Sequence, residues 1–592
     1  MSHKHVVNDP QKLAVDSLVG LGRLNPALAI DTTHRIAHLR KVPRDRVAIV
    51  SGGGSGHEPA HAGFVGDGLL SAAVCGNVFA SPNVGQIRQA IDHVSNDKGT
   101  LAVIMRYTGD FLLFGLAKEQ QAVTQPDKPF RLTVVGDDVA VPRSQGRLVG
   151  RRGLAGTVLV YKLAAALAET GADIDEVHAL AEYSATRVGT MGAGLEHCHV
   201  PGTGPAKAHL GPAEVELGMG IHNESGIAKI SLPSSAELVE KMLAYIIDTT
   251  DKERAFLPYQ HDGKDEVILL VNNLGGMSEL ELSSIANDTV KALEERQSKI
   301  AVKRIMVGTV MTSLNLPGFS ITTLLLPRDG DKYSSSQILQ FFDAPASAPG
   351  WRFTSQGEPG IPGTTSSSAS SSALAIQGGS TPLAPTDAAL FEKAVVSACE
   401  ALVQAEPEIT RFDTIAGDGD AGLTLKAGAE GILAMIRAGK LNPNDTIASV
   451  FEFANVVEEV MGGTSGALYS IWSNALAAGL ARASASKATP AVWASALDHA
   501  LSVLYNYTAA RRPSRTLIDP LAAFTESFAS SRGADFAAAV AEAEKACEET
   551  KDLVAQAGRA AYVDREGLQN AQVPDPGAFG VVTILKGIQA VS

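Results

Sequence analysis

Three aspartates in the last third of the chain are the clearest candidates for chemistry. Asp413, Asp418 and Asp420 fall within eight residues, and Gly417 and Gly419 leave the backbone between them accessible. Two ionised carboxylates about 4 Å apart repel by roughly 4 kcal/mol at an effective dielectric near 20, so a folded cluster of three requires divalent cations. Oxygen ligands favour Mg2+, which keeps positions open for substrate phosphates. Ordinary Asp-Gly turns are the alternative, but the spacing favours a metal site.

A glycine-rich segment in the first third is a second candidate site. The apolar run at residues 47–50 leads into residues 51–59, which contain three consecutive glycines and His57. At the carboxyl end of a strand, where α/β sheets place their sites, the amides of such a loop can close on a small polar ligand. Asp110 follows another apolar run and could face the same crevice. A tight structural turn, and a helix N-cap at Asp110, are the alternatives.

His222 is the third candidate, and glycines surround it. Gly218, Gly220 and Gly226 suggest that its imidazole must approach a ligand closely. A neutral imidazole nitrogen is a nucleophile that can add to a carbonyl, so His222 could hold a small ketone as a hemiaminal. A lone histidine is more often an ordinary polar residue, and that interpretation stays open at this point.

The elements that would position these residues change type along the chain. Short apolar runs ending in Gly, Asn or Asp predict an α/β region with buried strands at residues 47–50, 101–105, 132–135, 267–271 and 305–307. Residues 344–385 are rich in Ser, Pro, Gly, Ala and Thr and predict a linker between domains at 1–343 and 386–592. A boundary between two subdomains of the first domain is expected near residues 190–211. After the linker, helical spacing at Phe391, Val395 and Cys399, and again over residues 447–460, predicts an all-helical domain.

Composition restricts the kinds of partner. The 592 residues carry a formal net charge of -14, which disfavours nucleic acid and anionic membrane surfaces and favours a small diffusible substrate. The four cysteines are far apart with no CxxC pair, which indicates a reducing compartment. No uncharged apolar stretch reaches the roughly 18 residues of a membrane span. A soluble, cytoplasmic protein is expected.

Seven motifs together resemble a known family. Four of them are similar to motifs of the single-chain, ATP-dependent dihydroxyacetone (glycerone) kinases. They are Gly-Gly-Ser-Gly-His-Glu-Pro at 53–59, Tyr-Thr-Gly-Asp at 107–110, Gly-Met-Gly-Ile-His at 218–222 and Gly-Asp-Gly-Asp at 417–420. Residues 312–320, 461–467 and 575–578 continue the resemblance in order across the linker. The resemblance implies an α/β ketone domain of two subdomains and an ATP-binding domain that forms an eight-helix barrel. It also implies a homodimer in which the ATP-binding domain of one chain covers the ketone site of the other.

The resemblance assigns roles to individual residues. It implies that His222 anchors the ketone covalently, and that His57 and Asp110 are the other catalytic residues. The substrate-binding residues implied are Gly54, Ser55, Gly56, His57, Met105 and Asp110, and the metal ligands for two Mg2+ ions are Asp413, Asp418 and Asp420. The residues implied for ATP are Asp418, Gly419, Asp420, Ala421, Thr464, Ser465, Arg515, Thr516, Asp575, Pro576 and Gly577.

The sequence differs from the usual pattern of this family at two places, and two other functions stay open. Met105 stands where the family usually has a lysine that contacts the substrate, and a thioether cannot donate that hydrogen bond. Residues 508–516 replace a more glycine-rich loop of the ATP-binding domain. The expected activity is phosphorylation of dihydroxyacetone, with glyceraldehyde as a further candidate substrate. The alternatives are a cyclising FAD-AMP lyase activity, which some family members also have, and a ketone-sensing regulator without turnover.

Overall fold

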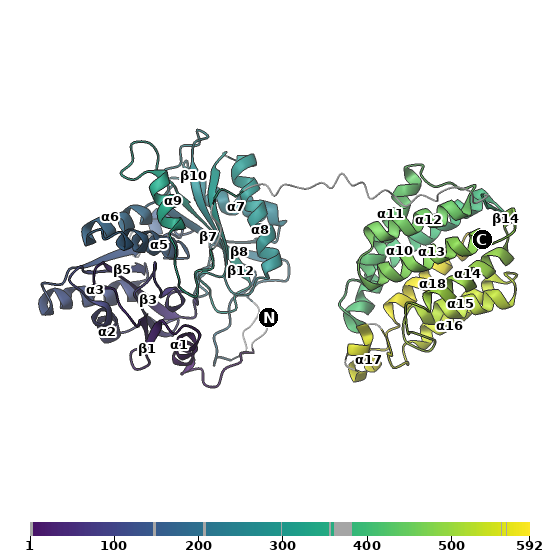
Figure 1. Ribbon diagram of the computed structural model, residues 1–592, viewed down its shortest axis with the longest axis horizontal. Helices are drawn as coiled ribbons and strands as arrows, with labels where there is room; N and C mark the ends of the chain where they lie inside the picture. Colours follow the sequence, from purple (N-terminus) through teal and green to yellow (C-terminus); the bar gives the residue numbers. More distant parts are fainter. Residues whose placement is uncertain are drawn as a thin grey trace. The chain divides into compact units, whose positions relative to one another are not determined.

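The chain folds into two compact units, Met1–Gly363 and Thr364–Ser592. The computed structural model in Figure 1 describes residues 4–145, 150–204, 209–297, 299–353, 357–359, 382–557, 559–563 and 565–592. Within these ranges, no helix is long and apolar enough to cross a membrane.

The first sheet of the first unit has the strand order β1-β2-β4-β3-β5-β6. The four strands β4, β3, β5 and β6 are parallel, whereas β1 and β2 pair antiparallel at one edge. Because parallel strands end at the same edge, the segments that follow β3 and β5 lie side by side. The strands are β1 (Leu28–Asp31), β2 (Ile36–Leu39), β3 (Ala48–Ser55), β4 (Ala72–Val78), β5 (Thr100–Met105) and β6 (Phe130–Val135).

The second sheet has the order β11-β10-β12-β7-β8-β9. Only β10 and β11 are parallel, and the other neighbours in this order are antiparallel. The strands are β7 (Val188–Gly194), β8 (Glu214–Leu217), β9 (Ala228–Ser231), β10 (Glu266–Asn273), β11 (Ala301–Gly308) and β12 (Gly318–Leu325).

Helix α5 packs between the two sheets and joins them in one core. It contacts β3, β5 and β6 of the first sheet and β7 and β12 of the second, and its side chains are nearly all buried. Helices α2 and α3 cover the other face of the first sheet, and α7 and α8 cover that of the second (Figure 1). The helices are α1 (Leu13–Leu24), α2 (Val84–Val94), α3 (Thr108–Thr124), α5 (Gly156–Glu169), α6 (Ile174–Ala185), α7 (Ser235–Ile247), α8 (Glu279–Lys291) and α9 (Ser335–Asp343), with short turns η1 (Ala62–Phe64) and η2 (Ala292–Gln297).

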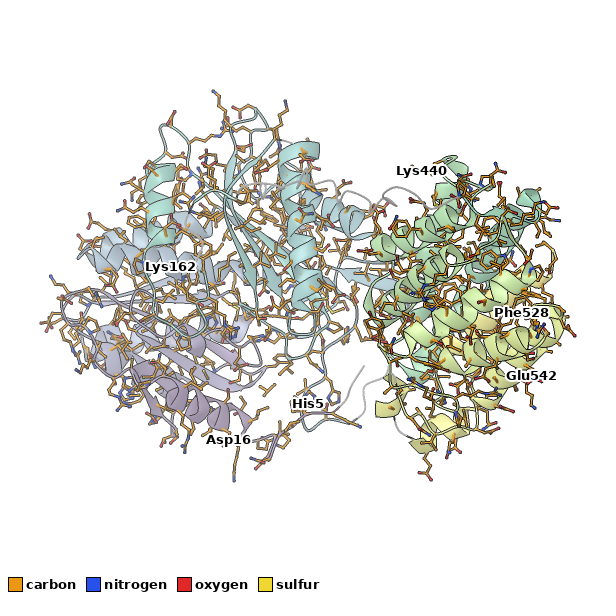
Figure 2. All side chains as sticks on the ribbon, turned by 45° about the vertical axis from the view of Figure 1, so that its right-hand side comes forward. His5, Asp16, Lys162, Lys440, Phe528 and Glu542 are labelled. Carbon is orange, nitrogen blue, oxygen red and sulfur yellow. The ribbon has the colours of Figure 1, made fainter. Side chains whose placement is uncertain are left out.

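The segment after α9 packs on the first unit, although its composition predicts a linker. Trp351 is buried, the amide of Gly350 donates to the carbonyl of Gly63 at 2.7 Å, and the ammonium of Lys162 on α5 (Figure 2) donates to the carbonyl of Ala344 at 2.6 Å. The apolar area of Trp351 accounts for this packing despite the surrounding Pro, Ala and Gly. The serine-rich part of the predicted linker, within residues 360–381, lies outside the described residues.

The second unit is a closed ring of eight helices. Each of α10, α11, α12, α13, α14, α15, α16 and α18 packs against the next, and α18 packs against α10. Two short strands, β13 (Ala384–Pro385) and β14 (Lys487–Ala488), pair beside the ring. The helices are α10 (Ala388–Ala416), α11 (Ala421–Arg437), α12 (Thr446–Val460), α13 (Gly463–Ala481), α14 (Pro490–Leu504), α15 (Ile518–Ser530), α16 (Phe536–Glu549), α17 (Arg565–Ala571) and α18 (Pro576–Gln589), with the turn η3 (Arg559–Tyr562).

Candidate active site

Two histidines from distant parts of the first unit meet at the edge where β3 ends. Nε2 of His57, just beyond β3, lies 3.0 Å from Nε2 of His222. The second sheet holds the glycine-rich loop in place, because the amides of Thr312 and Leu314 donate to the carbonyls of His57 and Gly56. Gly56 has a φ of +103°, a conformation that side chains rarely adopt. The structure therefore brings together His57 and His222, to which the sequence analysis assigned roles at one ketone site.

The outer nitrogens of the two rings fix where their protons lie. Nδ1 of His57 is 2.7 Å from the carbonyl oxygen of Thr312, and Nδ1 of His222 is 3.1 Å from Oε1 of Glu224. Both partners are acceptors, so both Nδ1 atoms carry hydrogen. The two Nε2 atoms therefore share one proton at 3.0 Å, and the pair carries one positive charge opposite the Glu224 carboxylate.

The electrostatic surroundings of the pair affect His57 and Glu224 strongly. Burial, followed by the nearby His222, lowers the pKa of His57 to about 3. Burial raises the pKa of Glu224, but the hydrogen bonds and charge of His222 outweigh that effect and lower it to about 2. Glu224 is therefore ionised at neutral pH, and its carboxylate lies against Nδ1 of His222.

Aromatic rings and a missing side chain define the space around His222. Phe79 and Tyr107 contact the imidazole edge-on, with centroids 5.0 and 4.7 Å away. A Cβ at Gly220 would lie 2.1 Å from Oε2 of Glu224 and 2.5 Å from Nη1 of Arg152. Gly220 is therefore required so that the carboxylate can reach its histidine.

A second group of side chains converges on Gly53. A Cβ placed there would lie 3.6 Å from the methyl carbon of Met105, 3.7 Å from Oδ2 of Asp110 and 3.8 Å from Nε2 of His61. Met105 is buried at the end of β5, and Asp110 lies in the first turn of α3, where Tyr107 rather than Asp110 is the N-cap. Burial raises the pKa of Asp110 to about 6, against the opposing effects of a hydrogen bond from Ser81 and the charge of His222. Such a carboxyl group can exchange a proton near neutral pH.

Three residues near Gly53, namely Ser55, Gly54 and Arg106, make contacts within the protein that restrict what they can offer a ligand. The Ser55 hydroxyl donates to the carbonyl of Gly76 at 2.8 Å, so a substrate contact from Ser55 would involve its backbone. A Cβ at Gly54 would lie 2.9 Å from the amide nitrogen of Ala80, which accounts for that glycine. The Arg106 guanidinium lies over the ring of Phe111, 5.5 Å from its centroid, and runs past Gly150 instead of turning towards Gly53.

The three predicted metal ligands lie together in the second unit. Asp413 is buried in the last turn of α10, and Asp418 and Asp420 are exposed in the loop before α11. One carboxylate oxygen from each lies within 4.8 Å of the others. Oδ2 of Asp413 also accepts from the amide of Ala421 at 3.0 Å, and Gly419 turns the loop with a φ of +85°. This all-oxygen set is of the kind that Mg2+ prefers.

Two buried groups beside α18 can face a polyphosphate. Arg515 is fully buried, its Nη2 donates to the carbonyl of Val573 at 3.0 Å, and its Nε and Nη1 have no hydrogen-bond partner in the part of the chain that the structure describes. Burial raises the pKa of Asp575 to about 7, against the lowering effects of the Ala578 amide and Arg515. Asp575 is the N-cap of α18, whose first residues are Pro576 and Gly577, and its carboxylate accepts from the backbone amide of Ala578 at 2.9 Å. The two unpaired nitrogens of Arg515, Nε and Nη1, are donors of the kind that bind phosphate.

The remaining predicted ATP residues lie at helix starts. Thr464 and Ser465 are in the first turn of α13, after Gly463, whose φ is +67°. The amide of Thr516 donates to Oδ2 of Asp519 at 2.8 Å, which holds the loop before α15. The amides of an α-helix N-terminus favour anions, so these positions suit phosphate contacts.

The structure adds several functional candidates to which the sequence analysis gave no role. His61 is fully buried and neither ring nitrogen has a partner among the described residues, and burial lowers its pKa to about 4. Glu224, Phe79 and Tyr107 complete the surroundings of His222. A carboxylate two residues after a glycine-flanked histidine was a usable signal for Glu224, whereas nothing in the sequence separated Phe79 from core aromatics.

Comparison with known proteins agrees with this geometry. The Dak1 domain family matches residues 19–350, and the DAK2 domain family matches residues 415–590. The chain is 41% identical over 619 residues to the dihydroxyacetone kinase of Pichia angusta, covering 99% of this chain and 98% of the relative. The chain belongs to the dihydroxyacetone kinase family.

Two further relatives extend the comparison across the dihydroxyacetone kinase family. The triokinase/FMN cyclase of Homo sapiens is 37% identical, with 100% of both chains covered. The crystal structure of the dihydroxyacetone kinase from C. freundii in complex with AMP-PNP and Mg2+ is 30% identical, covers 100% of both chains and has a TM-score of 0.61. The predicted fold class, an α/β unit followed by an all-helical unit, is confirmed.

Proposed function

We propose that this chain is an ATP-dependent, Mg2+-dependent kinase that phosphorylates dihydroxyacetone, with glyceraldehyde as a further candidate substrate. The observation that carries the proposal is the 3.0 Å contact between Nε2 of His57 and Nε2 of His222, with both outer nitrogens tied to acceptors. Relatives named dihydroxyacetone kinase support it, as does the relative solved with AMP-PNP and Mg2+. Release of ADP that depends on added dihydroxyacetone tests it.

The histidine pair can bind a ketone covalently, with His222 as the nucleophile and His57 as the proton donor. Transfer of the shared proton from His222 to His57 frees the Nε2 lone pair of His222, which attacks the carbonyl carbon. The carbon–nitrogen bond forms, the carbonyl π electrons move to oxygen, and Nε2–H of His57 protonates that oxygen. Glu224 holds Nδ1 of His222 throughout and compensates the positive charge of the substituted ring.

Asp110 is the candidate base for the hydroxyl that receives the phosphoryl group. Its carboxylate lies beside Gly53 and interacts with His222, so a ketone held on His222 can present a hydroxyl to it. Mg2+ at the aspartate cluster would neutralise charge on the ATP phosphates. Arg515, Thr464 and Ser465 would bind and orient the nucleotide, since phosphoryl transfer depends mainly on positioning and charge.

The pKa of Asp110 predicts how activity depends on pH. As pH falls through about 6, the carboxylate takes up a proton and can no longer accept one from the hydroxyl. We therefore expect kcat/KM for dihydroxyacetone to decrease on the acidic side of this value and to level off above it. Asp110→Asn should have low activity at every pH and lack this acidic limb. A flat profile for the parent from about pH 5 to about pH 8 would contradict the base assignment.

Met105 predicts weaker ketone binding than a lysine at that position would give. A hydrogen bond from a charged donor is worth about 1.5 to 3 kcal/mol, or roughly ten- to more than a hundredfold in affinity. Met105→Lys should therefore tighten ketone binding by about that factor and leave ATP affinity unchanged, while Met105→Leu, the matched control, should change neither. Calorimetry showing equal ketone affinity for the lysine and leucine variants would place Met105 outside the binding interaction.

We further propose a cytoplasmic homodimer with active sites shared between chains. The ketone site and the aspartate cluster belong to different units, so transfer requires one unit to dock on the other, from the same chain or a second copy. The cysteines Cys75, Cys198, Cys399 and Cys547 are free and buried, which suits a reducing compartment.

Mixing two inactive variants tests the shared site. Equal amounts of His222→Ala and Asp418→Ala, allowed to exchange subunits, should recover about a quarter of the parent activity, because half of the dimers are mixed and each contains one intact site. If sites form within one chain, the mixture should be as inactive as each variant alone.

Cyclising FAD-AMP lyase activity is the second candidate function. The human relative that matches the whole chain is named triokinase/FMN cyclase, which favours testing it. Incubation with FAD and a divalent cation, followed by separation of the flavin products, distinguishes the two activities. A regulator without turnover would bind dihydroxyacetone and consume no ATP.

A further inference from the structure

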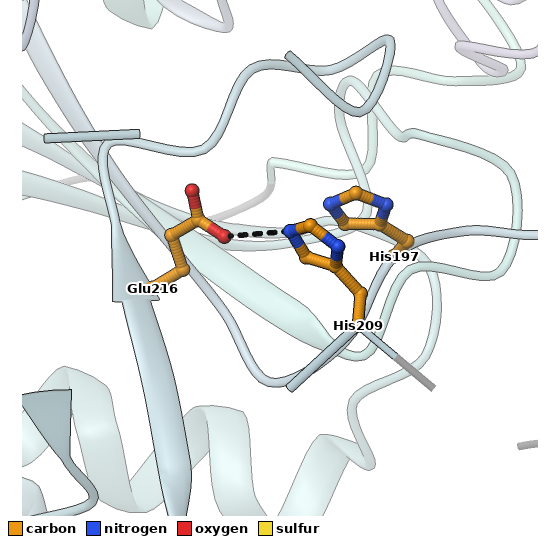
Figure 3. Close-up of side chains that lie close together, drawn as sticks. All are labelled: His197, His209 and Glu216. Atoms are coloured by element: carbon orange, nitrogen blue, oxygen red, sulfur yellow. Dashed lines mark ion pairs between the residues drawn. The ribbon is translucent and has the colours of Figure 1, made fainter. Parts of the chain in front are cut away.

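Two histidines and a glutamate form a cluster outside both candidate sites described above. His197 follows β7, His209 precedes β8, and Glu216 lies within β8. One ligand atom from each lies within 4.8 Å of the others. Figure 3 shows the three side chains side by side. The imidazole rings of His197 and His209 stack with centroids 3.6 Å apart.

Two buried polar atoms of this cluster lack partners. Glu216 is 2% exposed, and its Oε2 has no hydrogen-bond partner among the described residues, although Nε2 of His209 lies 3.5 Å away. Nε2 of His197 is likewise buried and without a hydrogen bond in the part of the chain described. Unpaired buried polar atoms are uncommon in folded proteins, because each loses its hydration without compensation. These two atoms therefore call for a ligand.

The surrounding groups hold the cluster in a fixed arrangement. The Glu196 carboxylate accepts from the backbone amides of His197 at 2.9 Å and His209 at 3.0 Å, so it ties together the two segments that carry the imidazoles. Oε1 of Glu216 accepts from the amide of Gly226 at 2.6 Å, which orients Oε2 towards the histidines. Hydrogen bonds of this kind orient the ligands of metal sites.

We propose that His197, His209 and Glu216 bind a divalent transition-metal ion of the Zn2+ type, with solvent in the fourth position. Nitrogen and oxygen ligands about 2.0–2.1 Å from a tetrahedral zinc are separated by roughly 3.3 Å, close to the 3.5 Å between His209 and Glu216. Two imidazoles and one carboxylate favour Zn2+ over Mg2+, whereas the all-carboxylate cluster of the second unit favours Mg2+. The two sites therefore select different metals.

Charge near the cluster is compatible with a cation. The carboxylates of Glu196 and Glu216 lie beside the imidazoles, and the Lys229 ammonium donates to the backbone carbonyl of His209 at 3.3 Å. The simplest alternative without metal is an ion pair between a protonated His209 and Glu216. That ion pair would still leave the buried Nε2 of His197 without a hydrogen-bond partner among the described residues.

A metal here would brace the segment that carries His222. The amide of Cys198 donates to the side chain of Asn223 at 2.9 Å, and the Asn223 amide group donates back to the Cys198 carbonyl at 3.1 Å. Cys198 follows His197, and Asn223 follows His222, so the cluster is connected to the ketone site through one pair of hydrogen bonds. The ion is therefore expected to be structural and to raise the thermal stability of the first unit.

Zn2+ binding by the full chain tests this proposal. The protein is stripped with a chelator, dialysed, and titrated with Zn2+ in excess Mg2+, which occupies the aspartate cluster. We expect one Zn2+ per chain, an increase in Tm on binding, and a tetrahedral absorption spectrum when Co2+ replaces Zn2+. Loss of a residue that only orients a metal ligand typically weakens metal binding 10- to 100-fold, so loss of a ligand itself in His197→Ala or His209→Ala should weaken it by about a hundredfold or more.

A matched control is available on α6. His178 on α6 lies 3.6 Å from Glu182, and the residues that the structure describes supply no third ligand to this pair. His178→Ala should therefore leave Zn2+ binding unchanged. His209 is exposed, so its replacement should not prevent folding. The absence of Zn2+ binding by the parent, or equal Zn2+ affinity in either His197→Ala or His209→Ala, would overturn the three-ligand site and leave the ion pair as the correct description.

Discussion

Asp418→Ala or Asp420→Ala is expected to reduce phosphorylation of dihydroxyacetone by about a thousandfold or more, because groups that neutralise charge in phosphoryl transfer are worth that much in rate. The two carboxylates and Asp413 place oxygens within 4.8 Å of one another. Removing one proposed ligand would weaken Mg2+ binding and would leave the charge on the ATP phosphates uncompensated.

The fold and ketone binding should survive both changes. Asp418 and Asp420 are exposed and belong to the second unit, whereas the ketone site lies in the first. Asp498→Ala, an exposed aspartate on α14, is the matched control and should retain parental turnover. Turnover of the Asp418 and Asp420 variants within a few-fold of the parent, measured at saturating Mg2+, would show that the cluster does not hold the catalytic metal.

His222→Ala is expected to abolish covalent ketone binding and to lower kcat/KM by about a hundredfold or more, the scale that loss of positioning alone can cost. With dihydroxyacetone labelled at its central carbon, the parent should convert the carbonyl resonance into that of a tetrahedral carbon, and the variant should not. The motivation is the arrangement of His222, whose Nδ1 lies 3.1 Å from Glu224 and whose Nε2 faces Nε2 of His57 at 3.0 Å.

Two further variants separate a nucleophile from a general polar residue. Glu224→Gln keeps an acceptor for Nδ1 but removes the compensating charge, so it should weaken the adduct less than His222→Ala does. His178→Ala changes an imidazole on α6 and should have no effect. An unchanged carbonyl resonance in the parent, together with full ketone affinity in His222→Ala, would rule out the covalent anchor.

Much of the fold could be predicted from local patterns. The apolar runs at residues 47–50, 101–105, 132–135, 267–271 and 305–307 coincide with β3, β5, β6, β10 and β11. The inner strands β3, β5 and β10 are buried almost throughout, as continuous apolar runs predict. The edge strands β6 and β11 are only partly buried, which differs from the prediction of buried strands there. β7 was harder to recognise: Val-Gly-Thr-Met-Gly-Ala-Gly contains three glycines, which resemble a boundary in the sequence but allow close packing in the sheet. The expected boundary near residues 190–211 accordingly begins inside this strand.

The candidate site was predictable where glycine and charge mark it. His57, Asp110 and His222 stand next to glycines required by close contacts, and the aspartate cluster is explicit in its spacing. The protonation of the histidine pair was not predictable, because it depends on the carbonyl of Thr312, which is 255 residues from His57 in the chain. The convergence of Met105, Asp110 and His61 on Gly53 depends in the same way on how α3 packs beside β3 and β5.

The most direct test of the proposed function is the stoichiometry of the reaction. The full chain is incubated with ATP, Mg2+ and dihydroxyacetone, and both ADP and dihydroxyacetone phosphate are quantified by phosphorus magnetic resonance. We predict one dihydroxyacetone phosphate for each ADP formed, and no ADP above background without the ketone or without the metal. ADP release that is independent of the ketone, or flavin cleavage in the absence of any phosphorylated triose, would contradict the assignment of this chain as a dihydroxyacetone kinase.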